Sequence, residues 1–176
     1  MSPSPPEATP LGTAPLVLVV SGPNLSLLGD RQPEIYGTET LEDHLAAAGR
    51  AAEAAGLRLE HVQSNHEGDL LDALHGARGR AAAVVVNAGA LTHTSWSLHD
   101  ALAAFDGVVL EVHLSNPAAR EPFRHTSVVA PVADGSIAGF GGYGYELAIT
   151  AVAHLLGLTP STNPSPAGPA TAKEER

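Results

Sequence analysis

The segment AAAVVVNAG (residues 81–89) is the part of the sequence that most clearly indicates the fold. It is a continuous apolar run that stops at Asn87 and Gly89. A run without polar alternation is typical of a strand covered on both faces, as in a parallel sheet between two layers of helices. The segment therefore predicts a buried strand with a polar residue at its end.

Strand-like and helix-like patterns alternate on both sides of this run. The pair Thr40 and Asp43 has the spacing of a helix capping box. Further strands are expected at 16–22, 57–64 and 108–114, and TSVVAP (126–131) follows as the next β-branched segment. Helices are expected at about 40–55, 67–78, 94–105 and 142–156, with a helical turn at 118–123. This alternation predicts a single α/β domain with a flavodoxin-like, doubly wound parallel sheet of five strands.

The two ends of the chain differ in composition from the part between them. Residues 1–15 and 158–176 contain nine of the 14 prolines and few large apolar residues. We interpret both as disordered tails around a folded unit at 16–157. With 176 residues, 44% of them hydrophobic, the chain is long enough for one domain with its own core.

The charge balance and the single lysine exclude several classes of function. The formal net charge is −10 and basic residues do not cluster, which argues against a nucleic-acid partner held through phosphates. The only lysine, Lys173, lies in the C-terminal tail. Schiff-base chemistry, pyridoxal phosphate and a P-loop all require a lysine inside a folded site.

The absence of cysteine excludes disulfides, thiolate metal sites and cysteine nucleophiles. It is compatible with a reducing compartment. No apolar run reaches the roughly 18 residues needed for a membrane span, and the first residues lack the features of a secretory signal. We therefore expect a cytoplasmic protein without a membrane partner. No spacing of acidic residues and histidines indicates a metal site.

Polar residues follow the expected strands at their carboxyl ends. Open parallel sheets bind their ligands at this edge, so a pocket is expected there. These residues are Asn24 after the first strand, Asn87 and His93 after the third, and Glu111, His113, Ser115, Asn116, Arg120 and Arg124 at or after the fourth.

The connection between the first strand and the first helix is long, at about 17 residues, which is typical of a functional loop. It contains Arg31 and Tyr36. A free tyrosine titrates near pH 10, so a phenolate base at neutral pH needs a neighbour such as a guanidinium that lowers its pKa. The alternative is a surface arginine and a tyrosine that packs the loop.

Glu111 and His113 are two residues apart on a strand, so their side chains leave the same face. A carboxylate beside an imidazole orients the ring and keeps it protonated, which suits a general acid. The alternative is a polar pair without chemistry. For His93, the alternative is a residue that begins a helix and binds no ligand. For Asn87, the alternative is an amide that bonds a neighbouring loop.

A glycine-rich segment and the remaining histidines are expected to have structural and not functional roles. The glycine-rich segment at 139–142 lacks the context of a phosphate loop and is expected to start the last helix. The remaining histidines are expected on the surface or in packing roles, and they include His44, His61, His66, His75, His99 and His154.

Five segments, taken together and in order, resemble the type II 3-dehydroquinate dehydratases. They are GPNLSLLGDRQPEIYG (22–37), QSNHEGDLLD (63–72), NAGALTHTSWSLHDAL (87–102), EVHLSN (111–116) and AREPFRHTS (119–127). The resemblance runs from about residue 17 to residue 156. It implies a lyase of the shikimate pathway that needs no metal or cofactor and removes water from 3-dehydroquinate by anti elimination through an enolate.

The resemblance also implies roles for single residues. Tyr36 matches the base, Arg31 the arginine that favours its phenolate, and Asn24 a residue that holds a water against the enolate oxygen. His113 matches the acid that protonates the departing hydroxyl, and Glu111 its orienting carboxylate.

The positions implied for substrate binding are Asn87, His93, Leu114, Ser115 and Arg124. Asp100 matches an acid that reaches a site across a subunit interface, in a homododecamer built as a tetramer of trimers. The sequence departs from the usual family pattern at Ser26, Gln32, Ala90 and Pro117. None of these departures removes a catalytic group.

Two other classes of function remain as alternatives. A non-catalytic binding module has no need to keep Tyr36, Arg31 and His113 together. A receiver domain or nucleotide-binding protein of flavodoxin-like fold needs clustered acids and a lysine, or a Ser/Thr-rich phosphate loop, and the sequence contains neither.

Overall fold

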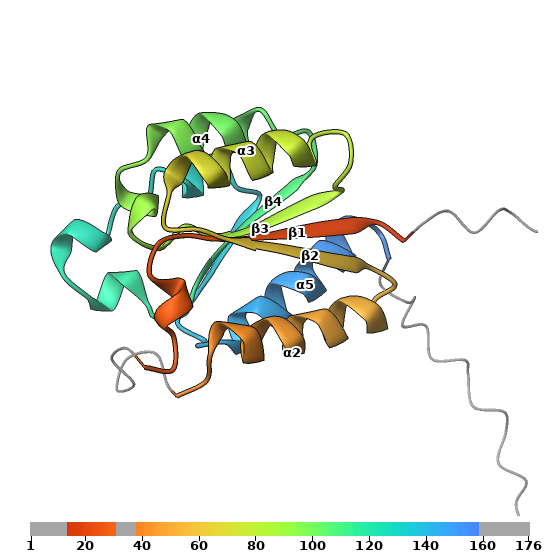
Figure 1. Cartoon of the computed structure of the whole chain (residues 1–176), viewed down its shortest axis with the longest axis horizontal. Coiled ribbons are helices and arrows are strands. Elements are labelled where there is room, and N and C mark those ends of the chain that lie inside the picture. Colours follow the sequence, from red (N-terminus) through yellow and green to blue (C-terminus); the bar gives the residue numbers. More distant parts are fainter. Residues whose placement is uncertain (1–13, 31–37, 159–176) are drawn as a thin grey trace, which may run out of the picture.

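A parallel sheet of five strands forms the centre of the molecule in the computed structural model, which describes residues 14–30 and 38–158 (Figure 1). The strand order is β2-β1-β3-β4-β5. The strands are β1 (Leu16–Ser21), β2 (Arg58–Gln63), β3 (Ala83–Asn87), β4 (Val108–His113) and β5 (Gly135–Ala138). The helices are α2 (Leu41–Ala54), α3 (Glu67–Ala77), α4 (Trp96–Ala103) and α5 (Tyr143–Leu155).

The strand order reverses next to β1. The chain moves from β1 outward to β2 and then returns to the other side of β1 with β3. Ser21, at the end of β1, lies beside Gln63 of β2 and Asn87 of β3 in the sheet register. A reversal of this kind separates the loops that leave neighbouring strands, and it opens a crevice at their carboxyl ends.

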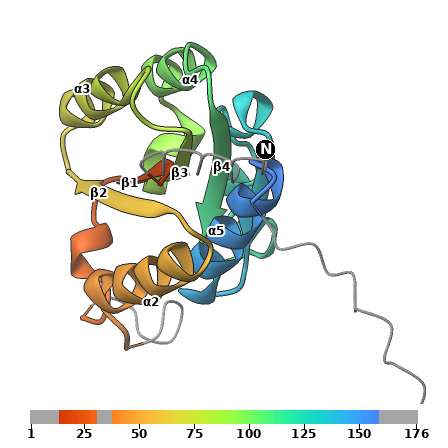
Figure 2. The ribbon, with the colours of Figure 1, turned by 90° about the vertical axis from the view of Figure 1, so that its right-hand side faces the viewer.

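Two layers of helices cover the sheet, α2 and α5 on one face and α3 and α4 on the other (Figures 1 and 2). The alternation along β1 produces both cores. Val17 and Val19 pack in the cluster with α2 and α5, while Leu18 and Val20 pack in the cluster with α3 and α4. The central strands are therefore buried on both faces, as the apolar run at 81–86 predicts.

The first predicted helix has the predicted start. The side chain of Thr40 accepts a hydrogen bond from the backbone N–H of Asp43, and the Asp43 carboxylate accepts one from the backbone N–H of Thr40. This capping box pairs backbone donors that the first helical turn leaves without partners. The other helices also form where the sequence predicts them, within a few residues at each end.

The fifth strand does not lie at TSVVAP (126–131), the β-branched segment that follows the fourth strand along the chain. That segment turns and enters the 3-10 helix η5 (Ala130–Val132), and the strand is Gly135–Ala138. The Ser127 hydroxyl accepts from the backbone N–H groups of Val129 and Ala130, which bends the chain. Pro131 has no N–H to donate to a neighbouring strand.

The segment at 139–142 starts α5, as expected. Gly139 and Gly141 have φ values of 88° and 57°, which favour glycine. Gly142 lies against the ring of His44, where a Cβ atom would come within 1.9 Å of Nδ1. No helix in the described part of the chain has the length and apolar character needed to cross a membrane.

Candidate active site

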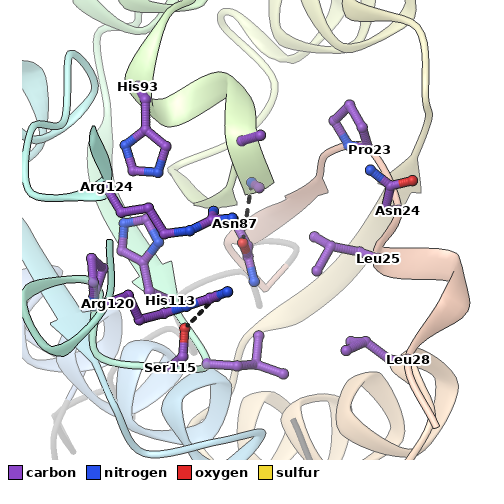
Figure 3. A pocket seen from close by; sticks show the side chains of 14 residues that line it. Pro23, Asn24, Leu25, Leu28, Asn87, His93, His113, Ser115, Arg120 and Arg124 are labelled. Atoms are coloured by element: carbon purple, nitrogen blue, oxygen red, sulfur yellow. Dashed lines mark hydrogen bonds between the residues drawn. The ribbon is translucent and has the colours of Figure 1, made fainter. Parts of the chain in front are cut away.

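A pocket opens at the carboxyl ends of β1, β3 and β4, at the edge that the strand order predicts (Figure 3). The residues after β1 form one wall, and those that follow β3 and β4 form the opposite wall. The lining consists of Pro23, Asn24, Leu25, Leu28, Asn87, Gly89, Ala90, His93, His113, Leu114, Ser115, Pro117, Arg120 and Arg124.

Most of the predicted site residues meet in this pocket. Glu111 lies behind His113 and does not line the pocket itself. Asp100 is exposed on α4 and is not part of the lining. Arg31 and Tyr36 lie outside the described residues. Those that line the pocket are Asn24, Asn87, His93, His113, Leu114, Ser115 and Arg124.

The pocket also contains residues that the predicted site does not include. Arg120 lines it, and its Nη1 lies 3.4 Å from the Ser115 hydroxyl. Pro23, Leu25 and Leu28 supply an apolar wall. Arg120 is among the polar residues that the sequence places after the fourth strand, at the edge where the pocket is expected, but the implied site positions give it no role.

His113 and Glu111 form an ion pair at the end of β4. His113 Nε2 lies 3.0 Å from Glu111 Oε1, and the side chains are 13% and 2% exposed. None of the described residues hydrogen-bonds the other ring nitrogen of His113, Nδ1. The ring is therefore anchored through Nε2, and Nδ1 is left for a molecule in the pocket.

Three hydroxyl groups surround the Glu111 carboxylate. Thr92 and Ser127 donate to Oε1, the latter at 2.8 Å, and Ser136 donates to Oε2 at 3.1 Å. Burial alone raises the pKa of Glu111, but the hydrogen bonds from His113, Thr92 and Ser127 and the charge of His113 outweigh it and lower the pKa to about 2. Glu111 is therefore a carboxylate at every physiological pH.

These hydroxyls were not predicted from the sequence, because they come from three separate segments. Thr92 belongs to the turn after β3, Ser127 to the turn before η5, and Ser136 to β5. Thr92 Oγ1 and Ser127 Oγ also lie 2.9 Å apart. Only the packing of these segments on β4 brings their side chains to one carboxylate.

Asn87 is 3% exposed and has partners for both ends of its amide. Nδ2 donates to the hydroxyl oxygen of Tyr145 at 3.1 Å, and Oδ1 accepts from the backbone N–H of Gly89 at 3.3 Å. The sequence-based alternative, that this asparagine bonds a neighbouring loop, is thus correct for its oxygen. The same side chain also lines the pocket.

Asn24 has a left-handed backbone, with φ of 66°, the single positive φ at a non-glycine residue within 14–30 and 38–158. Its N–H donates to Asn65 Oδ1 at 2.9 Å, which holds the turn after β1 against the turn after β2. Asparagine tolerates this conformation better than most residues. Strained backbone of this kind concentrates at functional sites.

His93 is held in one tautomer. Its Nδ1 lies 2.7 Å from the carbonyl oxygen of Thr126, which can only accept, so Nδ1 carries a proton. The ring of Phe123 meets the imidazole edge-on at 6.1 Å. The other ring nitrogen, Nε2, is therefore the one available to a ligand.

The wall after β4 carries positive charge. Arg124 Nε donates to Glu121 Oε2 at 2.8 Å, and its guanidinium lies over the Phe123 ring at 4.7 Å from the centroid. Arg120 also contacts Glu121, at 3.6 Å. The two arginines form a cationic site for an anion on a chain of net charge −10. Within the described residues, no group of three or more metal-ligating side chains occurs.

Comparison with known proteins assigns the chain to a family. The family model for class II dehydroquinases matches residues 15–153. The chain belongs to this family. It is 52% identical over 142 residues to 3-dehydroquinate dehydratase 2 of Pseudomonas putida, covering 81% of this chain and 95% of that one. It is 55% identical over 140 residues to 3-dehydroquinate dehydratase of Ruegeria pomeroyi, covering 79% and 94%.

Solved structures of the family share the fold. The type II dehydroquinase of Propionibacterium acnes superposes with a TM-score of 0.76 and is 42% identical, covering 79% of this chain and 96% of that one. The enzyme of Butyrivibrio crossotus gives a TM-score of 0.78 at 40% identity, covering 80% and 99%. The predicted five-stranded, flavodoxin-like α/β fold is therefore confirmed.

Proposed function

We propose that this chain removes water from 3-dehydroquinate to form 3-dehydroshikimate, by anti elimination through an enolate and without a metal or cofactor. Curated relatives that are more than half identical over about 140 residues bear the name 3-dehydroquinate dehydratase, which supports this substrate for the shikimate pathway. The single observation that carries the proposal is the Glu111–His113 pair, in which buried Glu111 supports His113 in the lining of a pocket that also contains two arginines.

His113 acts as the general acid. Hydroxide is a poor leaving group, so the C–O bond breaks readily only if a proton reaches the departing oxygen. The Glu111 carboxylate orients the imidazole through Nε2, and Nδ1 donates the proton to the departing oxygen. The three hydroxyls around Glu111 keep that carboxylate ionised in turn.

Tyr36 acts as the base, with Arg31 favouring its phenolate. The proton next to the ketone is removed on the face opposite to the departing hydroxyl, so the base and the acid must be separate groups. Asn24 holds a water molecule that donates a hydrogen bond to the enolate oxygen. These three roles follow from the family resemblance.

The cationic wall binds the substrate carboxylate. Arg124, the Ser115 hydroxyl and the backbone of Leu114 lie on the side that follows β4, while His93 and Asn87 contact ring hydroxyls. Asp100 is exposed on α4, which is consistent with a contribution to the site of a neighbouring subunit. We propose a homododecamer, a tetramer of trimers, that acts in the cytoplasm.

The test is the ultraviolet absorbance of the conjugated enone product after the purified protein is mixed with 3-dehydroquinate. Absorbance should rise in the presence of a chelator, and Lys173→Ala should change nothing because no imine forms. Tyr36→Phe should abolish turnover while substrate still binds. A silent wild-type protein that nevertheless binds the substrate would indicate the non-catalytic binding module instead.

The assembly has its own test. Sedimentation should show a particle of about twelve chains, and Asp100→Asn should reduce activity without unfolding the subunit. A fully active monomer would contradict both the assembly and the role of Asp100.

A further inference from the structure

A chain of hydrogen bonds runs from the pocket into the protein behind Asn87. The side chains of Ser21 and Asn87 are neighbours in register on β1 and β3, and they point to the face covered by α2 and α5. Tyr145 of α5 packs over this pair and is completely buried. The chain continues to His61 on the edge strand β2.

The direction of the donors in this chain follows from its first link. The backbone N–H of Gly89 can only donate, so the atom of the Asn87 amide that faces it must be the oxygen. The amide nitrogen consequently faces Tyr145, and the phenol oxygen accepts its hydrogen bond. The proton of the phenol then needs an acceptor of its own.

The Ser21 hydroxyl acts on the Tyr145 phenol: it lowers the pKa of Tyr145 against the larger effect of burial, and Ser21 is itself completely buried. Beside the neutral phenol, this hydroxyl oxygen can accept the phenol proton. A serine that accepts from the phenol can pass its own proton on to His61 Nε2, which lies 3.1 Å from Oγ. All donors then point outward from the pocket, from Asn87 through Tyr145 and Ser21 to His61.

The Tyr145 ring has little freedom to move away from Asn87. The His44 imidazole stacks on it with centroids 6.3 Å apart and an angle of 26° between the planes. Gly142 lies against the His44 ring, where a Cβ atom would come within 1.9 Å of Nδ1, so the imidazole is itself confined. Neither Tyr145, Ser21 nor His61 lines the pocket, so any influence on a bound substrate has to pass through Asn87.

We propose that Tyr145, supported by Ser21, is a positioning residue that holds the Asn87 amide in the single orientation used for substrate binding. This proposal rests on the proposed function, because the substrate contact of Asn87 is part of it. Without the phenol oxygen, the buried Asn87 nitrogen loses its acceptor, and the amide is no longer fixed at both ends.

Tyr145→Phe tests the proposal with little change of shape. We expect kcat/KM to fall about tenfold, mainly through KM, since one buried hydrogen bond is lost. Tyr143→Phe is the matched control, because Tyr143 lies on the same helix but is 58% exposed. It should leave kcat/KM unchanged. Ser21→Ala, which removes the second link, should have a smaller effect of the same kind.

A double-mutant cycle separates positioning from general structural support. In an Asn87→Ala background, Tyr145→Phe should change kcat/KM by less than about twofold, because the residue through which it acts is gone. An equal loss in both backgrounds would overturn the proposal. Unchanged kinetics of Tyr145→Phe in the wild-type background would also overturn it.

A measurement without substrate keeps the proposal separate from the proposed function. The chain has five asparagines, so selective ¹⁵N-asparagine labelling yields few side-chain amide signals, and Asn87→Ala identifies the one from Asn87. Tyr145→Phe and Ser21→Ala should shift or broaden this signal, and Tyr143→Phe should not. An unaffected Asn87 signal would overturn the positioning role even in an active enzyme. A shifted signal in a protein without dehydratase activity would contradict only the proposed function.

Discussion

The imidazole of His113 and the carboxylate of Glu111 are joined by a 3.0 Å contact between Nε2 and Oε1 at the end of β4. The two residues face the α3 and α4 side of the sheet, and Glu111 is in register with Val86 of β3. The carboxylate is closed off by hydroxyls from three other segments, and the imidazole stands between it and the pocket. One charged pair thus connects the core of the protein to the site.

Replacing Glu111 by Gln should lower kcat about 100-fold with a small change in KM. An amide carries no charge and cannot orient the His113 ring as the carboxylate does, so proton transfer to the departing oxygen becomes slower. Glu53→Gln, an exposed change on α2, is the control. A Glu111→Gln variant with the kcat of the wild type would contradict this role.

Glu111 should also contribute to the acid sensitivity of the fold. Its pKa is lowered from 4.5 to about 2, so the native state binds fewer protons than the unfolded state between these values. The corresponding stability is present above about pH 4.5 and is lost as the pH falls toward 2. Urea unfolding at a series of pH values should show a flatter dependence in this window for Glu111→Gln. If the unfolding free energy of the two proteins changed with pH in the same way, Glu111 would not contribute to the acid sensitivity.

The left-handed backbone of Asn24 allows its structural and chemical roles to be separated. Asn24→Ala should destabilise the protein by about 1 kcal/mol, because a Cβ without a compensating side chain is strained at φ of 66°. Asn24→Gly removes the same amide but tolerates this φ, and should retain wild-type stability. If the amide holds a catalytic water, both variants lose kcat to the same extent. Activity retained by the glycine variant would show that only the turn matters.

Alanine substitutions at Gly22 and Gly76 should have opposite effects on stability. A Cβ on Gly22 would come within 2.3 Å of the Ala88 carbonyl oxygen, where β1 and β3 approach each other. Gly22→Ala should therefore cost more than about 2 kcal/mol of unfolding free energy. Gly76 lies within α3 with open space around it. Gly76→Ala should stabilise the protein by about 0.5–1 kcal/mol. Similar thermal midpoints for the two variants would contradict this contrast.

The sequence by itself determined the architecture and most of the pocket. The uninterrupted apolar run at 81–86 and the alternation with helical segments predicted a sheet buried on both faces, because burial dictates the hydrophobic pattern of each strand. Polar residues at strand ends had to meet, since parallel strands end at one edge. Asn87, His93 and His113 were found in this way, and Glu111 followed from its two-residue spacing to His113.

The tertiary structure alone decided which side chains surround these residues. The hydroxyls of Thr92, Ser127 and Ser136 around Glu111, and the phenol of Tyr145 behind Asn87, come from segments up to 58 residues away along the chain. Serine, threonine and tyrosine carry no periodic signal that distinguishes a buried partner from a surface residue. Their roles depend on how the turns and α5 pack on the sheet, because a hydrogen bond requires a distance and a direction that the local sequence does not specify.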